Sequence, residues 1–187
     1  MTLSGFLQRL LFVNQFSINE GKVEILGTNY ILLDASYILA LQDIDKTKMY
    51  QTAKYASIEN VKNLVEHAEV YKNIKDQSLK NIAELSRKIG KTDEGTIKTL
   101  QMIFDIYGLG KMQILDLNND KKTAIVQIQN SSIAIEQYKK GRTTIPKCTL
   151  TAGMLAGLFS FIFGKDVNCN ENKCFAKGDE ACFFNIA

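Results

Sequence analysis

The chain has 187 residues, enough for one domain with a sizeable core, and its single proline and lack of a Ser/Gly-rich linker mark no boundary within 1–187. Its hydrophobic content of 45% and charged content of 23% are those of a globular protein. The net charge of +3 comes from lysines spread along the chain, and the absence of a dense basic run argues against nucleic-acid binding.

The N-terminal region, residues 1–34, predicts strands and a contact between two copies of the chain. Apolar runs predict strands at 6–18 (or a short helix there), 23–26 and 30–33, with a turn at 19–22. The segment 6–16 is too apolar to face water, and isologous dimers are the commonest assembly, so we predict a homodimer. A short helix is predicted to begin at Tyr37, with Ser36 as its cap.

The middle of the chain changes to a helical period. Apolar residues recur at helical spacing in three stretches, 58–68, 79–89 and 97–107. Gly90 and Gly95 separate the second stretch from the third. Gly108 and Gly110 end the third, because glycine adopts the left-handed cap conformation at little cost.

After residue 110 the sequence predicts a sheet and one buried helix. Strands are expected on both sides of a turn at 118–121, and again at 167–174 and 182–186. Residues 131–145 are predicted to be irregular or weakly helical. The segment 149–163 is apolar all round, which is typical of a buried helix. The expected fold class is α+β, an antiparallel sheet with a helical layer.

The buried helix carries small residues that allow another backbone to approach closely, namely Ala152, Gly153, Ala156 and Gly157. We expect this face to lie close to the sheet. The uncharged run 148–164 is shorter than a membrane span, and the N-terminus lacks the basic region and cleavage site of a signal peptide. These features predict a cytoplasmic protein without a membrane span.

Four cysteines, Cys148, Cys169, Cys174 and Cys182, are the candidates for metal binding. Cys174 and Cys182 end two predicted strands and Cys148 begins the buried helix, so their thiolates can meet and bind zinc. Cys169 and Glu171 lie on one face of a strand, which leaves the fourth ligand open. Inert core thiols and redox or disulfide chemistry are the alternatives. The lack of CxxC argues against thioredoxin-like exchange, and a reducing cytosol argues against disulfides.

The C-terminal pattern resembles the vinyl-4-reductase domain family, a group of predicted small-molecule or hydrocarbon-binding domains. The resemblance covers residues 130–184. It comprises Asn130-Ser131, Cys148 before a helix with Ala152-Gly153 and Gly157, Gly164, and the run Glu171-x-x-Cys174-x-A-x-Gly178-Asp179-x-x-Cys182-x-Phe184. The N-terminal half is similar to the family only loosely.

The resemblance implies a fold like that of TRAPP subunits and haem-based nitric-oxide sensors. It also implies a zinc site of three cysteines and a glutamate, which here would be Cys148, Glu171, Cys174 and Cys182. Four protein ligands would leave no open position, so the zinc would be structural. Cys169 departs from the family pattern and remains an alternative fourth ligand.

The sequence does not predict an enzyme, because it contains neither GxGxxG nor GxxxxGK[ST], and its one histidine, His67, has charged neighbours. The leading hypothesis is a module that binds an apolar, hydrocarbon- or lipid-like molecule between the helical middle and the helix 149–163. The pocket candidates are Phe104, Tyr107, Ala156, Phe159 and Phe163. The alternatives are a dimeric adaptor without a ligand and an accessory protein or enzyme of tetrapyrrole reduction.

Overall fold

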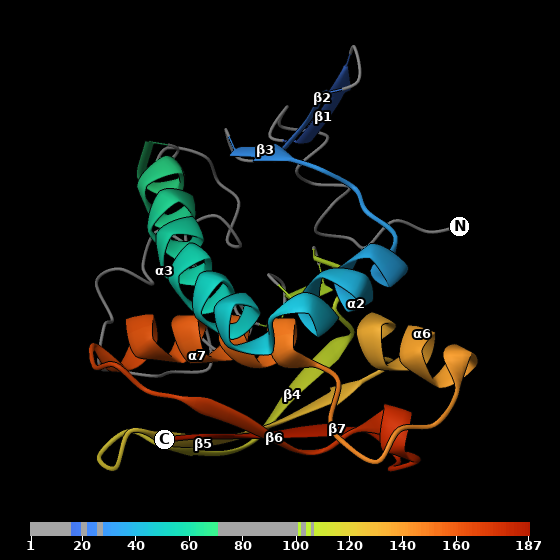
Figure 1. Ribbon diagram of the computed structural model, residues 1–187. Coiled ribbons are helices and arrows are strands. Elements are labelled where there is room, and N and C mark those ends of the chain that lie inside the picture. Colours follow the sequence, from blue (N-terminus) through green and yellow to red (C-terminus); the bar gives the residue numbers. More distant parts are fainter. Residues whose placement is uncertain (1–15, 20–21, 26–27, 71–100, 102–103, 106) are drawn as a thin grey trace.

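The main sheet is antiparallel and is covered on one face by helices (Figure 1). The computed structural model describes residues 16–19, 22–25, 28–70, 101, 104–105 and 107–187. The strand order is β4-β5-β7-β6, with the bounds β4 Lys111–Asn118, β5 Thr123–Gln129, β6 Cys169–Lys173 and β7 Cys182–Ile186. The predicted α+β class is therefore confirmed.

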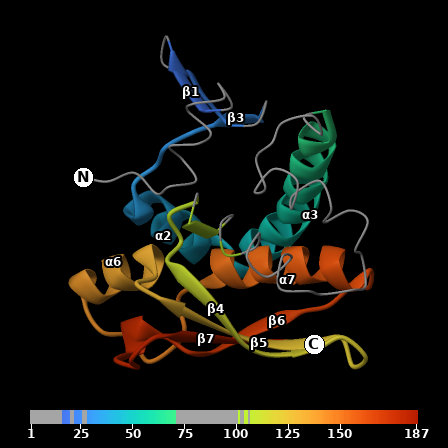
Figure 2. The same ribbon diagram turned by 180° about the vertical axis from the view of Figure 1, so that it is seen from behind.

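Two helical layers lie over the same face of this sheet. The first contains α6 (Ser132–Lys140) and α7 (Thr149–Phe163), and the second contains α2 (Ala35–Ile44) and α3 (Lys46–Val70). Figure 2 shows the same order of layers from behind. The core joins buried side chains of α7, β5 and β7, including Val126, Leu155, Phe159 and Phe184. None of the described helices is long and apolar enough to cross a membrane.

A second, smaller sheet precedes α2. It consists of β1 (Phe16–Asn19), β2 (Lys22–Ile25) and β3 (Thr28–Tyr30), paired antiparallel in that order. The predicted turn is confirmed, because Asn19 pairs with Lys22. The prediction of a strand at 30–33 was wrong beyond Tyr30, since residues 31–33 have no regular structure and are exposed. Residues 6–15 lie outside the described part of the chain.

Helix α2 begins earlier than predicted because its cap is an aspartate. The Asp34 side chain accepts a hydrogen bond from the Ser36 backbone N–H at 2.7 Å. The prediction of Ser36 as the cap was therefore wrong. An aspartate at this position satisfies an otherwise unpaired first-turn N–H and favours the positive end of the helix dipole.

The long helix α3 contains the first predicted helical stretch, 58–68. The second stretch, 79–89, lies outside the described residues. Of the third, residues 101, 104 and 105 are helical, and Gly108 follows with a φ of 64° that suits its predicted role as a helix end. Residues 132–140, which were expected to be irregular or weakly helical, form α6 because Ser131 caps it and Gly141 ends it.

The small residues of α7 face α3 rather than the sheet, so this part of the prediction was wrong. A side chain at Gly153 would collide with the Tyr50 carbonyl oxygen, and one at Gly157 would collide with that of Lys54. The two helices therefore touch through their backbones. This contact fixes the first turns of α3 beside the start of α7, where Cys148 lies.

Candidate metal centre

Four side chains from three consecutive segments converge below the start of α7. Cys148 is the N-terminal cap residue of α7, and Glu171 lies on β6. Cys174 follows β6, and Cys182 begins β7. One ligand atom from each residue lies within 4.8 Å of the others, and all three cysteines are fully buried. The sequence predicted this set, and the structure brings it together.

The spacing of the sulfur atoms suits a metal ion better than a disulfide. The Sγ atom of Cys148 lies 4.0 Å from that of Cys174 and 3.7 Å from that of Cys182, and the remaining pair is 4.0 Å apart. A tetrahedral zinc ion with bonds of about 2.3 Å to sulfur places its ligands about 3.8 Å from one another. A disulfide needs about 2.05 Å.

Glu171 supplies the second observation that points to a cation. Its Oε2 atom accepts a hydrogen bond from the Cys148 backbone N–H at 2.8 Å. Its Oε1 atom is buried and has no hydrogen-bond partner among the described residues. A buried carboxylate oxygen without a partner is costly, and a divalent ion at the sulfur cluster would satisfy it.

The electrostatics of the cluster show what a cation would change. Burial, and then the charge on Cys174, raises the pKa of Glu171 to about 8. The thiol of Cys148 has a pKa well above its ordinary value because it donates hydrogen bonds toward Cys174 and Cys182 and because it is buried. Without an ion the site resists holding several negative charges, whereas a bound divalent ion would stabilise them.

The loop between β6 and β7 holds two of the thiols in place. The Cys174 backbone N–H donates to Asp179 Oδ2 at 2.8 Å, and the Phe175 N–H donates to Cys182 Sγ at 3.4 Å. Gly178 allows this tight turn, with a φ of 97°. Ser131 Oγ lies 3.6 Å from Cys148 Sγ. Hydrogen bonds of this kind orient metal ligands.

Gln42 of α2 fixes the segment that carries Cys148. Its side chain is 1% exposed. Its Nε2 donates to the Lys147 carbonyl, and its Oε1 accepts from the Leu150 N–H at 3.4 Å. No sequence pattern indicated this role, because Gln42 lies 105 residues from Lys147. Ser131 and Asp179 belonged to the recognised C-terminal pattern, but no role was predicted for them.

We expect Gln42→Ala to weaken metal binding by roughly ten- to a hundredfold, the usual cost of losing a group that orients a ligand. The substitution leaves the Lys147 carbonyl and the Leu150 N–H unpaired beside Cys148. Titration against a chromophoric chelator measures the affinity. Gln51→Ala, at an exposed position of α3, is the matched control. Equal affinities for the two variants would show that Gln42 does not position the site.

Cys169, the alternative fourth ligand, is not a member of the four-residue group. It is buried, and burial raises the pKa of its thiol, which keeps it neutral. It faces Ile186 near the far end of β7, whereas Glu171 faces Phe184, closer to Cys182. The structure thus places Glu171, and not Cys169, next to the three sulfur atoms.

The apolar pocket candidates occupy the core. Phe104, Ala156 and Phe159 are fully buried, and Phe163 is 3% exposed. Tyr107 packs against this core but is only partly buried. The described pockets of about 390, 230 and 380 Å³ are lined by other residues. A cavity lined by the five candidates therefore stays a prediction, since 71–100 of the helical middle lie outside the described residues.

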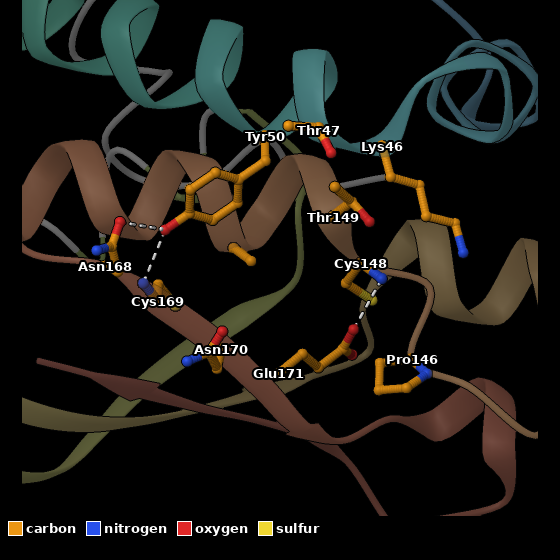
Figure 3. Close-up of a pocket in the computed structure, with 11 residues that line it drawn as sticks. Lys46, Thr47, Tyr50, Pro146, Cys148, Thr149, Asn168, Cys169, Asn170 and Glu171 are labelled. Atoms are coloured by element: carbon orange, nitrogen blue, oxygen red, sulfur yellow. Dashed lines mark hydrogen bonds between the residues drawn. The ribbon is translucent and has the colours of Figure 1, made fainter.

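A cleft of about 390 Å³ opens beside the metal centre, between the first turns of α3, the start of α7 and strand β6 (Figure 3). Lys46, Thr47 and Tyr50 lie above it, and Glu171 and Asn170 lie below. The Tyr50 hydroxyl accepts from the Cys169 backbone N–H at 2.8 Å. This hydrogen bond ties α3 to β6 across one end of the cleft.

Comparisons with known proteins agree with the C-terminal pattern. The family model of the vinyl-4-reductase domain matches residues 130–187, which contain all four candidate ligands. The uncharacterized protein MJ0745 of Methanocaldococcus jannaschii is 26% identical over 169 residues, which cover 85% of this chain and 86% of the relative.

Solved structures share the fold at low sequence identity. The phenol-responsive sensory domain of the transcription activator PoxR, determined with phenol, has a TM-score of 0.62 and 17% identity over 99% of this chain and 90% of its own. A vinyl-4-reductase family protein from Methanocaldococcus jannaschii has a TM-score of 0.49 and 17% identity, covering 86% and 83% of the two chains. The first of these similarities supports the α+β fold.

Proposed function

Because the chain carries a vinyl-4-reductase domain at residues 130–187, we propose that it is a small-molecule-binding module whose C-terminal part is organised around one zinc ion. The observation that carries the zinc is the set of three buried sulfur atoms, 3.7–4.0 Å apart, beside an unpaired carboxylate oxygen. Thiolate ligands in this arrangement favour zinc over magnesium or calcium. In this proposal, residues 1–187 form one domain.

The ion would act mainly as a cross-link. Its ligands come from the start of α7, from β6 and from β7, so one ion joins the buried helix to two strands. The site thereby holds in register the elements that form the base of the helical layers. The proposed role of the chain is binding rather than catalysis.

The ligand proposed is apolar with one polar group, and Tyr107 is its anchor. The Tyr107 hydroxyl is buried and completes no hydrogen bond among the described residues. Its ring lies 6.1 Å from that of Tyr30, between centroids. Burial raises the pKa of Tyr107, so its hydroxyl stays protonated and can donate a hydrogen bond. The shared fold with the PoxR sensory domain, which was solved with phenol, supports a binding role.

We expect dodecanol to raise the melting temperature of the protein more than dodecane does, because only the alcohol can accept a hydrogen bond from Tyr107. Tyr107→Phe should remove this difference, at a cost of about 0.5–1.5 kcal/mol in binding. Tyr55→Phe, at an exposed tyrosine of α3, should keep it. If no hydrophobic compound raises the melting temperature of the wild type, the binding module must be abandoned.

A dimeric adaptor is the second candidate, and α2 favours it. Tyr37, Leu41 and Ile44 recur at helical spacing on α2 and are 63%, 48% and 80% exposed. An apolar row of this kind suits contact with another protein surface. The predicted homodimer contact at 6–16 lies almost wholly outside the described residues, so the homodimer itself stays a prediction.

A further inference from the structure

The cleft beside the metal centre reaches one side of the ligand set. Cys148 and Glu171 line it, whereas Cys174 and Cys182 do not. Its volume of about 390 Å³ lies within the range of small-molecule sites. A molecule in this cleft would approach the cluster from the side of the carboxylate, as Figure 3 shows.

Glu171 is the most accessible of the four ligands. The three cysteines are each 0% exposed, whereas Glu171 is only partly buried. Its Oε2 atom is held by the Cys148 N–H, and its Oε1 atom is free to bind the ion. If another donor replaced Oε1, the bond from the Cys148 N–H would still hold the carboxylate in place.

We propose that this cleft binds a small thiol, whose sulfur replaces the Glu171 carboxylate as the fourth ligand of the metal centre. The inference rests on the metal centre of the proposed function and goes beyond its structural role. Zinc favours thiolate sulfur over carboxylate oxygen when the geometry permits both. The incoming thiol releases its proton to the solvent, and no oxidant or reductant is required.

The walls of the cleft define the rest of the thiol. Pro146, Ala152 and the Tyr50 ring offer apolar surface for a short carbon chain. Lys46 stands at the rim and forms no ion pair with a described residue, so its ammonium group is available for an anionic tail. The favoured ligand class is therefore a short thiol with a carboxylate or similar anion at its other end.

The full-length protein loaded with cobalt(II) provides the test, because thiolate binding to cobalt changes its visible absorption. Titration with 3-mercaptopropionate should give a saturable increase in thiolate-to-cobalt absorption. Propionate should give none, and 2-mercaptoethanol should bind roughly tenfold more weakly because it lacks the anion. Lys46→Gln should remove the preference for 3-mercaptopropionate over 2-mercaptoethanol.

Two tryptophan variants test the route. Thr47→Trp fills the cleft from an exposed position of α3, and it should weaken thiol binding by roughly tenfold or more without changing cobalt content. Thr52→Trp, also exposed on α3 and outside the cleft lining, should bind thiol like the wild type.

The outcomes separate this inference from the proposed function. A cobalt-loaded protein with an unchanged spectrum at saturating thiol overturns the exchange at Glu171. Equal thiol binding by the two tryptophan variants overturns the cleft as the route, and removal of cobalt by the thiol overturns ternary binding. A wild type that takes up no cobalt contradicts the metal centre itself.

Discussion

Cys174→Ser is expected to release the metal ion and to cause a large loss of stability. The substitution removes one of three sulfur ligands from a fully buried cluster and leaves two thiols and a carboxylate without their cation. Structural zinc contributes about 10–16 kcal/mol of apparent binding free energy in zinc-finger peptides. Here the apolar core retains part of the fold, so we expect a loss on the order of 5 kcal/mol.

Urea unfolding with and without a strong chelator measures this effect. The chelator should destabilise the wild type and leave Cys174→Ser unchanged. Cys169→Ser is the matched control, because Cys169 is also a buried thiol of the same strand region but lies outside the cluster. It should keep the ion and remain sensitive to the chelator. If both serine variants lost equal stability and neither lost metal, the cysteines would be ordinary core residues.

Gly157→Ala is expected to destabilise the protein, although alanine is the better helix former. Helix propensity alone predicts a gain of about 1 kcal/mol. The added Cβ atom, however, would collide with the Lys54 carbonyl oxygen and lie 2.9 Å from the Ser57 Cβ atom. A backbone atom in a helix cannot move away cheaply, so we expect a net loss of about 2 kcal/mol or more.

The sign of the change decides this prediction. Thermal or urea unfolding of Gly157→Ala should show a less stable protein, and a more stable one would mean that α3 and α7 do not touch through their backbones. The structure also corrects the expectation that a larger residue at Gly157 would narrow a ligand cavity. Such a residue would push against α3 instead.

The sequence predicted the elements whose patterns are local. The segment 149–163 matches α7 and the segment 182–186 matches β7, because an all-apolar run and a short strand before the C-terminus leave few alternatives. The cap of α2 was misplaced by two residues, since Asp34 and Ser36 are both good caps and only their backbone geometry distinguishes them. The end of β3 was misplaced because exposed apolar residues follow Tyr30.

The fourth ligand could not be chosen from spacing alone. Cys169 and Glu171 lie two residues apart on β6 and share a face, but two residues correspond to about 6.6 Å along a strand. Glu171 is closer to the end where Cys174 and Cys182 lie, and its longer side chain reaches the Cys148 N–H. Gln42 could not be found at all, because its contacts join α2 to a segment 105 residues away.

The mass of the intact wild-type chain, measured under native conditions after preparation with zinc, tests the metal centre most directly. The account predicts one zinc ion per chain, retained by Cys169→Ser and absent from Cys174→Ser. A wild-type chain that carries no metal, and whose melting temperature is the same with and without a chelator, would contradict it.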